Sequence, residues 1–155
     1  GVRHDVLAAC VTPEADDLVL LVARVEALQA FLATPDGGNL LQGYRRASNI
    51  LTAEEKKDGV EYSLDPDPKF AESEPERALF AALDAAEAAL DAALPAEDFA
   101  AAMAALAALR PAVDGFFDGV LVNAENSVLR RNRLCLLHRV RQTMARVADF
   151  GALEG

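Results

Sequence analysis

The chain contains no tryptophan, only two cysteines and two histidines, and few aromatic residues, which make up 6% of its 155 residues. Hydrophobic residues still account for 52%, so burial must come mainly from Leu, Val and Ala, which favours helices over a β-sandwich. Cys10 and Cys135 lack the spacing of metal ligands, and only His4 and His138 could assist them, so we expect no zinc site. We expect both cysteines to be small core or boundary residues in a reducing compartment.

Long hydrophobic runs are also missing. No apolar run reaches the roughly 18 residues that a membrane span requires. The best candidate, LVLLVARVEALQAFLA, is interrupted by Arg24 and Glu26. The chain begins GVRHDV, without an initiator Met and without the basic-then-apolar pattern of a signal peptide. We therefore expect a soluble, cytoplasmic domain that has no membrane partner and is cut from a longer chain.

Positive charge is scarce and unevenly distributed. The formal net charge is −10, from 15 basic and 25 acidic residues. Such a domain repels a phosphate backbone at long range, which argues against generic nucleic-acid binding and against DNA as a partner. Salt confines this repulsion to about 8 Å at physiological ionic strength, so the distribution of charge matters more than its sum. Residues 130–146, RRNRLCLLHRVRQTMAR, hold six arginines and no acidic residue.

Apolar residues recur at steps of three and four along much of the chain, a spacing typical of amphipathic helices. The pattern predicts helices over residues 16–33, 39–51, 73–94, 96–110 and 124–150. Asn39 is the expected cap of the second helix. SEPE forms a capping box, with Ser73 as cap and Glu76 three residues later. We predict an all-α fold in which residues 1–155 form one domain, an antiparallel bundle of five to six helices.

Three stretches interrupt the helical pattern. TPDGG, residues 34–38, is expected to end the first helix because its glycines supply backbone freedom. Residues 52–72 contain two prolines, one glycine and no helical period, which predicts a long polar loop. RPAVDGFFDGVLVN, residues 110–123, is predicted to be a further break.

Alanine dominates the predicted helices in the middle of the chain. Between Ala78 and Ala108, 17 of 31 positions are alanine. Alanine is the best helix former and lets helices approach closely, but a compositional bias of the source genome would give the same pattern.

The arginines of residues 130–146 do not all point the same way if this segment is helical. Arg133 points into the apolar arc, where an unpaired charge is costly, so we expect it to meet a carboxylate, carbonyl oxygens or a ligand. Asp114 and Asp118 are the expected structural partners. The other five arginines surround the exposed side, with Arg130 and Arg141 at the edge of the arc. They form either a solvated face that answers neighbouring acidic helices or a stripe that binds phosphates.

Four stretches taken together suggest a family: GNLLQGYRRASNIL, EEKKDG, ALRPAVDGFFDGVLV and RRNRLCLLHRVRQTMARVADF. They resemble, in the same order, the C-terminal end of the bacterial glycyl-tRNA synthetase beta subunit, and the similarity extends from about Arg3 to Phe150. That end is an anticodon-binding domain of the DALR type, related to the one in arginyl-tRNA synthetase. The resemblance implies an all-helical, C-terminal domain that contacts the anticodon region of the tRNA for glycine.

The resemblance also implies partners and cofactors. In that enzyme a separate alpha subunit uses ATP and Mg to activate glycine and charge the tRNA, and two alpha and two beta subunits form a heterotetramer. This chain would contribute tRNA recognition to the ligase and hold no cofactor itself. The sequence departs from the family pattern at Gly119 and Asn123, although Asn123 suits the cap of the last helix.

The matching blocks and the arginine stripe supply candidate tRNA-binding residues. These are Arg45, Arg46, Asn49, Arg130, Arg131, Arg133 and Arg141. Tyr44 and Asn132 also match, and we expect them to pack and cap rather than to contact RNA.

Two other functions need consideration. The dipeptide His4–Asp5 occurs in metal-dependent phosphohydrolases, but the further His and Asp ligands of such a site are lacking. The chain has no phosphate-binding glycine loop and no nucleotide-binding signature of a synthetase, so we expect no catalytic and no metal site. The alternative to RNA binding is an acidic helical scaffold that docks a protein partner through its arginine-rich last helix.

Overall fold

The structure is a computed structural model that describes residues 3–11 and 17–153. These residues form helices and the connections between them, with no strand in the described ranges. The helices are α1 (His4–Cys10), α2 (Leu18–Leu32), α3 (Pro35–Asp58), α4 (Glu74–Ala93), α5 (Phe99–Ala107), α6 (Arg110–Gly119) and α7 (Ser127–Ala145). Two 3-10 turns, η1 (Pro68–Phe70) and η2 (Phe150–Ala152), complete the described elements. The predicted all-α fold is confirmed: the expected helices correspond to α2, α3, α4, α5 and α7, whereas α1 and α6 were not predicted.

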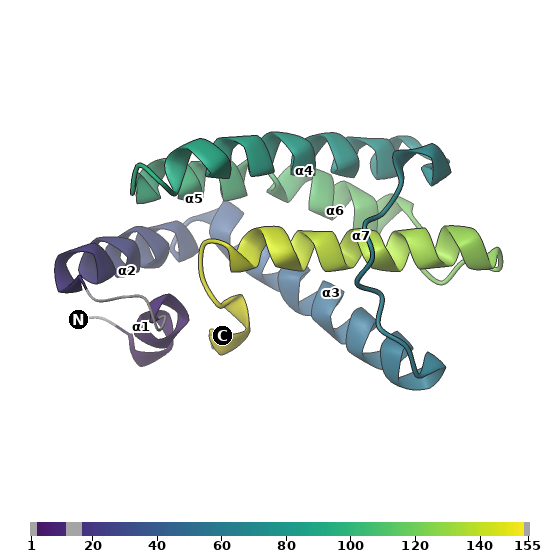
Figure 1. The fold of residues 1–155 in the computed structure, drawn as a ribbon, viewed down its shortest axis with the longest axis horizontal. Coiled ribbons are helices and arrows are strands. Elements are labelled where there is room, and N and C mark those ends of the chain that lie inside the picture. The colour runs from purple at the N-terminus through teal and green to yellow at the C-terminus, as the bar shows by residue number, and fades with distance from the viewer. Residues whose placement is uncertain (1–2, 12–16, 154–155) are drawn as a thin grey trace.

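Helix α7 runs between α4 and α3 in the view of Figure 1. It packs against α3 and α4, while α4 also covers α5 and α6, and α2 packs against α5. Leucine is the commonest residue of the core, and the largest fully buried side chains include Phe116 and Phe150. Burial of each such side chain contributes about 1.5–3 kcal/mol, which explains how a chain with few aromatics holds together. The two ends meet where the backbone N–H of Asp149 donates to the carbonyl of Ala9 at 2.9 Å.

The junction of α2 and α3 differs from the prediction. TPDGG does not separate two helices by a loop, because α3 begins at Pro35 with Thr34 as its cap, and Asn39 lies inside the helix. The two helices meet at 92°. At this bend the chain passes so closely that a Cβ on Gly37 would lie 2.0 Å from the carbonyl oxygen of Phe31. Gly37 is therefore needed for the close approach and not as a helix terminator.

The polar segment predicted as a loop over residues 52–72 begins instead at Gly59. Residues 52–58 continue α3, because Ala, Glu and Lys are good helix formers even when no apolar period marks them. Gly59 ends the helix in the left-handed conformation, with φ of 69°. The remaining connection, residues 59–73, crosses α7 on its way to α4 (Figure 1). The side chain of Asn132 holds it by pairing with both the N–H and the carbonyl of Asp67.

The predicted break at residues 110–123 is wrong for most of its length, since α6 occupies Arg110–Gly119. Its proline lies in the first turn, where the missing N–H costs no hydrogen bond. Helix α7 is also shorter than predicted. Its cap is Asn126 and not Asn123, and it ends at Ala145, before η2.

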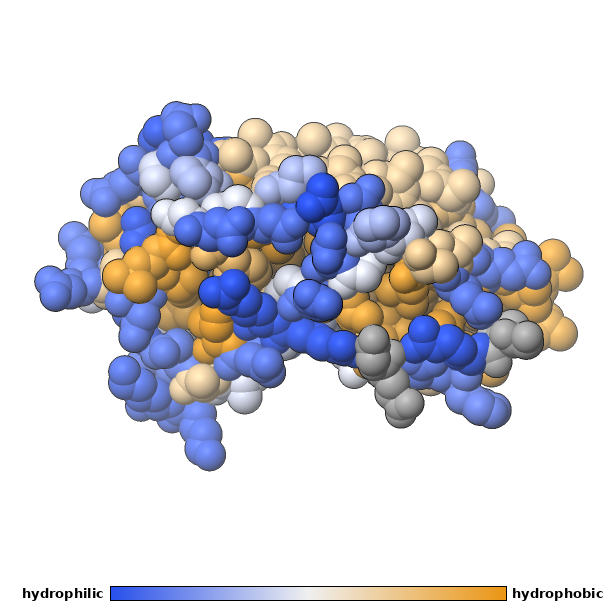
Figure 2. Space-filling view, turned by 180° about the vertical axis from the view of Figure 1, so that it is seen from behind, coloured by the Kyte–Doolittle hydropathy of each residue, from blue (hydrophilic) through white to orange (hydrophobic). Residues whose placement is uncertain are grey.

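The alanines of α4 and α5 serve the surface as well as the core. Seen from behind, the edge of the molecule formed by these helices is mildly apolar (Figure 2). Ala86 and Ala102 are buried, whereas Ala85, Ala88 and Ala101 are exposed. Close helix packing therefore explains only part of the alanine bias.

One segment of the described ranges, Phe99–Gly119, is long and apolar enough to cross a membrane by length and composition, and the bent α2–α3 pair would be a second. Phe99–Gly119 comprises α5 and α6, and 44% of it is buried within the bundle. The core helices of globular domains have the same composition, so this is weak evidence for a membrane span.

Candidate nucleic-acid interface

The arginines of α7 lie beside the acidic residues of α3 and α4. Arg139 pairs with Asp84 at 2.5 Å and with Glu87 at 2.7 Å, and these carboxylates raise its pKa. Arg146 pairs with Asp91 at 2.7 Å. Positive charge is collected in residues 130–146 because this segment forms α7 and the turn after it, and the arginines along one edge face the acidic residues of α4.

Arg133 occupies the buried position that its helical direction predicts. Its guanidinium pairs with Glu76 and donates to the carbonyl of Leu121 at 2.8 Å. The expected carboxylate and carbonyl partners are therefore present, but the carboxylate is Glu76 and neither Asp114 nor Asp118. Glu76 also accepts from the backbone N–H of Ser73 in the capping box. Burial raises the pKa of Glu76, but Arg133 and the N–H donors outweigh it, so its pKa lies below the ordinary value.

Arg130 joins α7 to the end of α3 and to the α3–α4 connection. Its guanidinium pairs with Glu54 and, at 2.7 Å, with Asp58, and it donates to the Tyr62 hydroxyl at 3.0 Å and to Asn123 at 2.6 Å. The Tyr62 hydroxyl in turn donates to Asp58 at 2.5 Å. This bond raises the pKa of Tyr62, and together with Arg130 it lowers the pKa of Asp58. The side chain of Arg130 is only 18% exposed.

The seven candidate residues therefore divide into two groups. Arg45, Arg130 and Arg133 are held by internal partners, Arg45 through a 2.9 Å hydrogen bond to the carbonyl of Leu153. The other four make no hydrogen bond or ion pair with a residue in the described ranges: Arg46, Asn49, Arg131 and Arg141. Arg46, Asn49 and Arg131 are exposed and Arg141 is half-buried. Only the second group is available to a phosphate or a base.

Tyr44 and Asn132 have the structural roles expected of them. The Tyr44 ring packs against Phe150 with centroids 5.8 Å apart. Asn132 is buried and holds Asp67, as described above.

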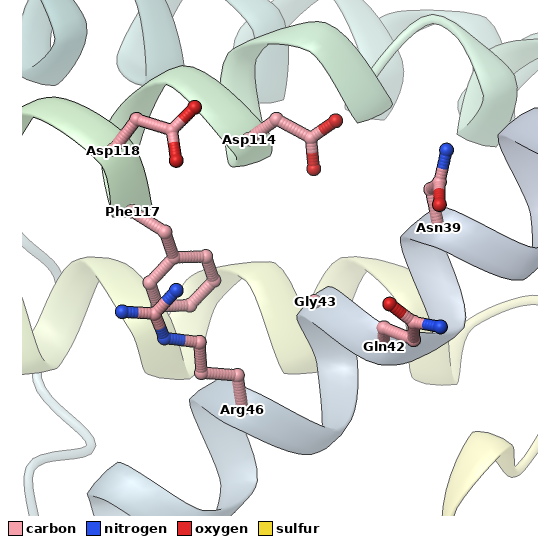
Figure 3. A pocket seen from close by; sticks show the side chains of 7 residues that line it. All are labelled: Asn39, Gln42, Gly43, Arg46, Asp114, Phe117 and Asp118. Carbon is pink, nitrogen blue, oxygen red and sulfur yellow. The ribbon is translucent and has the colours of Figure 1, made fainter.

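A polar pocket of about 270 Å³ lies between α3 and α6 (Figure 3). The Arg46 guanidinium lies over the Phe117 ring, 4.6 Å from its centroid, and Asp114 and Asp118 come from the same helix as Phe117. Asn39 and Gln42 line the α3 side.

The sequence indicated Arg46 but not the α6 side of this pocket, because residues 110–123 were predicted to be a break between helices. The spacing of Asp114, Phe117 and Asp118, three and four residues apart, places them on one face of a helix and was the available signal. Gly43 brings the two helices together, since a Cβ there would lie 2.9 Å from Val113.

No group of three or more His, Cys, Asp or Glu side chains in the described ranges is arranged to hold a metal ion. Cys10 and Cys135 are both buried and unpaired with each other, and burial raises the pKa of each thiol. A raised thiol pKa disfavours the reactive thiolate form.

Residues 40–150, from α3 to η2, match the family of the DALR anticodon binding domain. The chain belongs to this family. The matched residues include the Arg130 cluster, the Arg133–Glu76 pair and, except for Asn39, the α3–α6 pocket. The DALR domain suggested by the sequence blocks is thus confirmed.

Individual relatives are glycine–tRNA ligase beta subunits. The chain is 65% identical over 156 residues to that of Cereibacter sphaeroides and 61% identical to that of Dinoroseobacter shibae. The identity to the beta subunit of Rhodospirillum centenum is 57% over 157 residues. Each comparison covers 100% of this chain and 22% of the relative. The DALR domain therefore spans about a fifth of the length of these curated relatives.

Proposed function

We propose that this DALR domain contacts the anticodon region of glycine tRNA as part of a glycine–tRNA ligase beta subunit. The observation that carries the proposal is the family match over residues 40–150, together with 57–65% identity to beta subunits along the whole chain. The exposed Arg131 and the half-buried Arg141 supply cations for phosphate oxygens, and the exposed Arg46 supplies a guanidinium for an RNA base. Most other arginines of α7 neutralise the domain's own carboxylates.

This division of the arginines sets the strength of the contact. A single-stranded segment loses about 0.7 log units of affinity per phosphate contact for each tenfold rise in salt, and a duplex about 0.9. Two contacts predict a slope of about 1.4 to 1.8, well below what six arginines would give. The DALR domain alone is therefore a weak binder whose contact adds to others in the full enzyme.

The remaining parts of the reaction lie outside this chain. In our proposal a separate alpha subunit binds ATP and Mg, forms glycyl-adenylate and charges the tRNA. Two alpha and two beta subunits assemble in the cytoplasm, and the DALR domain supplies recognition without a catalytic group of its own.

The alternative of a scaffold that docks a protein through α7 finds less support. Arg130, Arg133, Arg139 and Arg146 are already paired within the domain, and α7 is covered by α3 and α4. Few of its charges remain to specify a partner.

Equilibrium binding tests the proposal. The beta subunit containing this chain, assembled with its alpha subunit, is titrated with glycine tRNA transcript at low and moderate salt. A transcript with a substituted anticodon is the control. Preferential, salt-sensitive binding of the glycine anticodon is expected. Equal affinity for both transcripts would overturn the proposal.

A further inference from the structure

The α3–α6 pocket, defined by Asn39, Gln42, Arg46, Asp114, Phe117 and Asp118, has a ready-made stacking platform. The Arg46 guanidinium lies over the Phe117 ring, and Arg46 is exposed (Figure 3). A guanidinium plane stacks on nucleobases as it does on aromatic rings. Arg46 keeps this position although two carboxylates line the same pocket and neither forms an ion pair with it.

The polar groups around the platform favour a base over a phosphate. Asp114 is partly engaged by Arg110 at 2.7 Å. Asp118 is exposed and makes no hydrogen bond or ion pair with a residue in the described part of the chain. Two carboxylates against one guanidinium repel an anion, but a carboxylate oxygen accepts well from an amino group. Asn39 and Gln42 add amides that both donate and accept.

The pocket is smaller than those that hold drug-sized ligands. Its volume of about 270 Å³ lies just below the range of about 300–1,000 Å³ found for drug-sized ligands. Gly43 fixes this width, because a larger residue would push α6 away at Val113.

We propose that the α3–α6 pocket receives one unpaired base of the tRNA anticodon loop, stacked on Arg46 and donating its exocyclic amino group to Asp118. This inference rests on the proposed function and adds the base class: cytosine, adenine or guanine is accepted and uracil is rejected. Uracil in place of cytosine replaces the amino donor by a carbonyl oxygen facing a carboxylate. Loss of one charge-assisted hydrogen bond predicts a roughly tenfold weaker affinity.

The test uses the assembled enzyme and synthetic anticodon-loop variants of glycine tRNA at one salt concentration. Each loop base in turn is replaced by a counterpart without its amino group: uracil for cytosine, hypoxanthine for adenine or guanine. Dissociation constants are measured for the wild-type enzyme and for Asp118→Asn. Glu97→Gln is the matched control, since it removes one exposed negative charge from the α4–α5 connection.

We expect one position at which the wild-type enzyme and Glu97→Gln lose roughly tenfold in affinity and Asp118→Asn loses little. At a cytosine or adenine the Asn amide donates to the new carbonyl, and at a guanine the variant has already lost the charged acceptor of the amino group. Retention of the full discrimination by Asp118→Asn would overturn the pocket assignment and leave the proposed function intact. Absence of any anticodon dependence in the wild-type enzyme would overturn both. Phe117→Leu, which removes the platform, is expected to weaken binding of all variants alike.

Discussion

Arg133 of α7 and Glu76 of α4 form the most deeply buried ion pair in the described ranges, with side chains 11% and 2% exposed. Glu76 is also the acid of the capping box that begins α4. Removal of Arg133 therefore leaves a buried carboxylate without its main partner. Breaking a buried pair in this way costs about 3–5 kcal/mol.

Arg133→Ala should consequently lower the melting temperature by on the order of 10 °C, since a domain of this size loses about 2–4 °C per kcal/mol. Thermal unfolding followed by circular dichroism provides the measurement. Arg131→Ala, at an exposed position two residues earlier, is the control and should melt within about 2 °C of wild type. A normal melting temperature for Arg133→Ala would show that Glu76 is satisfied without it.

The same pair makes stability depend on pH in the acid range. The folded pKa of Glu76 lies below its ordinary value of 4.5, so its contribution is complete above pH 4.5 and is lost as pH falls through the folded pKa. The difference in unfolding free energy between wild type and Glu76→Gln should therefore shrink from pH 7 to pH 3. Urea titrations at several pH values measure this difference. A constant difference would mean that the carboxylate titrates normally.

The sequence makes Arg130 a candidate tRNA contact, but its four partners predict a structural role. Arg130→Ala should lower the unfolding free energy by about 1–3 kcal/mol, because Glu54 and Tyr62 lose a charged hydrogen-bond donor. Amide hydrogen exchange of residues 59–67 should accelerate in the variant. Unchanged stability together with weaker tRNA binding would restore the original expectation.

Arg141→Ala and Arg131→Ala should instead weaken tRNA binding roughly a few-fold with little change in stability. Each should reduce the salt slope by about 0.7 to 0.9, the value of one phosphate contact. Arg146→Ala changes the net charge equally but removes a side chain paired with Asp91, so it should leave the slope unchanged. Identical slopes for all three variants would count against direct phosphate contacts.

Two adjacent glycines in the first turn of α3 should respond in opposite ways to alanine. A Cβ at Gly37 would lie 2.0 Å from the Phe31 carbonyl oxygen, whereas at Gly38 nothing lies within 4 Å. Gly37→Ala should destabilise the domain by about 1–3 kcal/mol through overpacking. Gly38→Ala should stabilise it by about 0.4–1 kcal/mol, because alanine restricts the unfolded chain. Comparison of the two melting temperatures decides the matter.

The sequence predicted features that depend on nearby residues better than those that depend on distant ones. SEPE correctly predicted the start of α4, because all groups of a capping box lie within a few residues. The start of α3 was missed because the need for Gly37 arises from contact with Phe31 at a bend. The end of α3 was missed because residues 52–58 are polar apart from Ala53 and show no apolar period.

In the candidate site, too, features set by nearby residues were predicted and contacts between distant residues were not. The helical direction of Arg133 predicted an internal partner, but the identity of Glu76, 57 residues away, depends on how α4 lies against α7. Resemblance to the family supplied Arg46. Phe117 and Asp118 were missed because a proline and two glycines made α6 look like a loop.

The α3–α4 connection has 15 residues and only one 3-10 turn, and such segments are usual sites of proteolytic cleavage. Here Arg130 of α7 donates a hydrogen bond to the Tyr62 hydroxyl. Two residues further along α7, the side chain of Asn132 pairs with both the backbone N–H and the carbonyl of Asp67. A protease can cleave this connection only after an extended stretch of it has been released from these contacts. Resistance of this connection to limited digestion therefore depends on the packing of α7. The rate of cleavage there reports whether α7 is packed against α3 and α4.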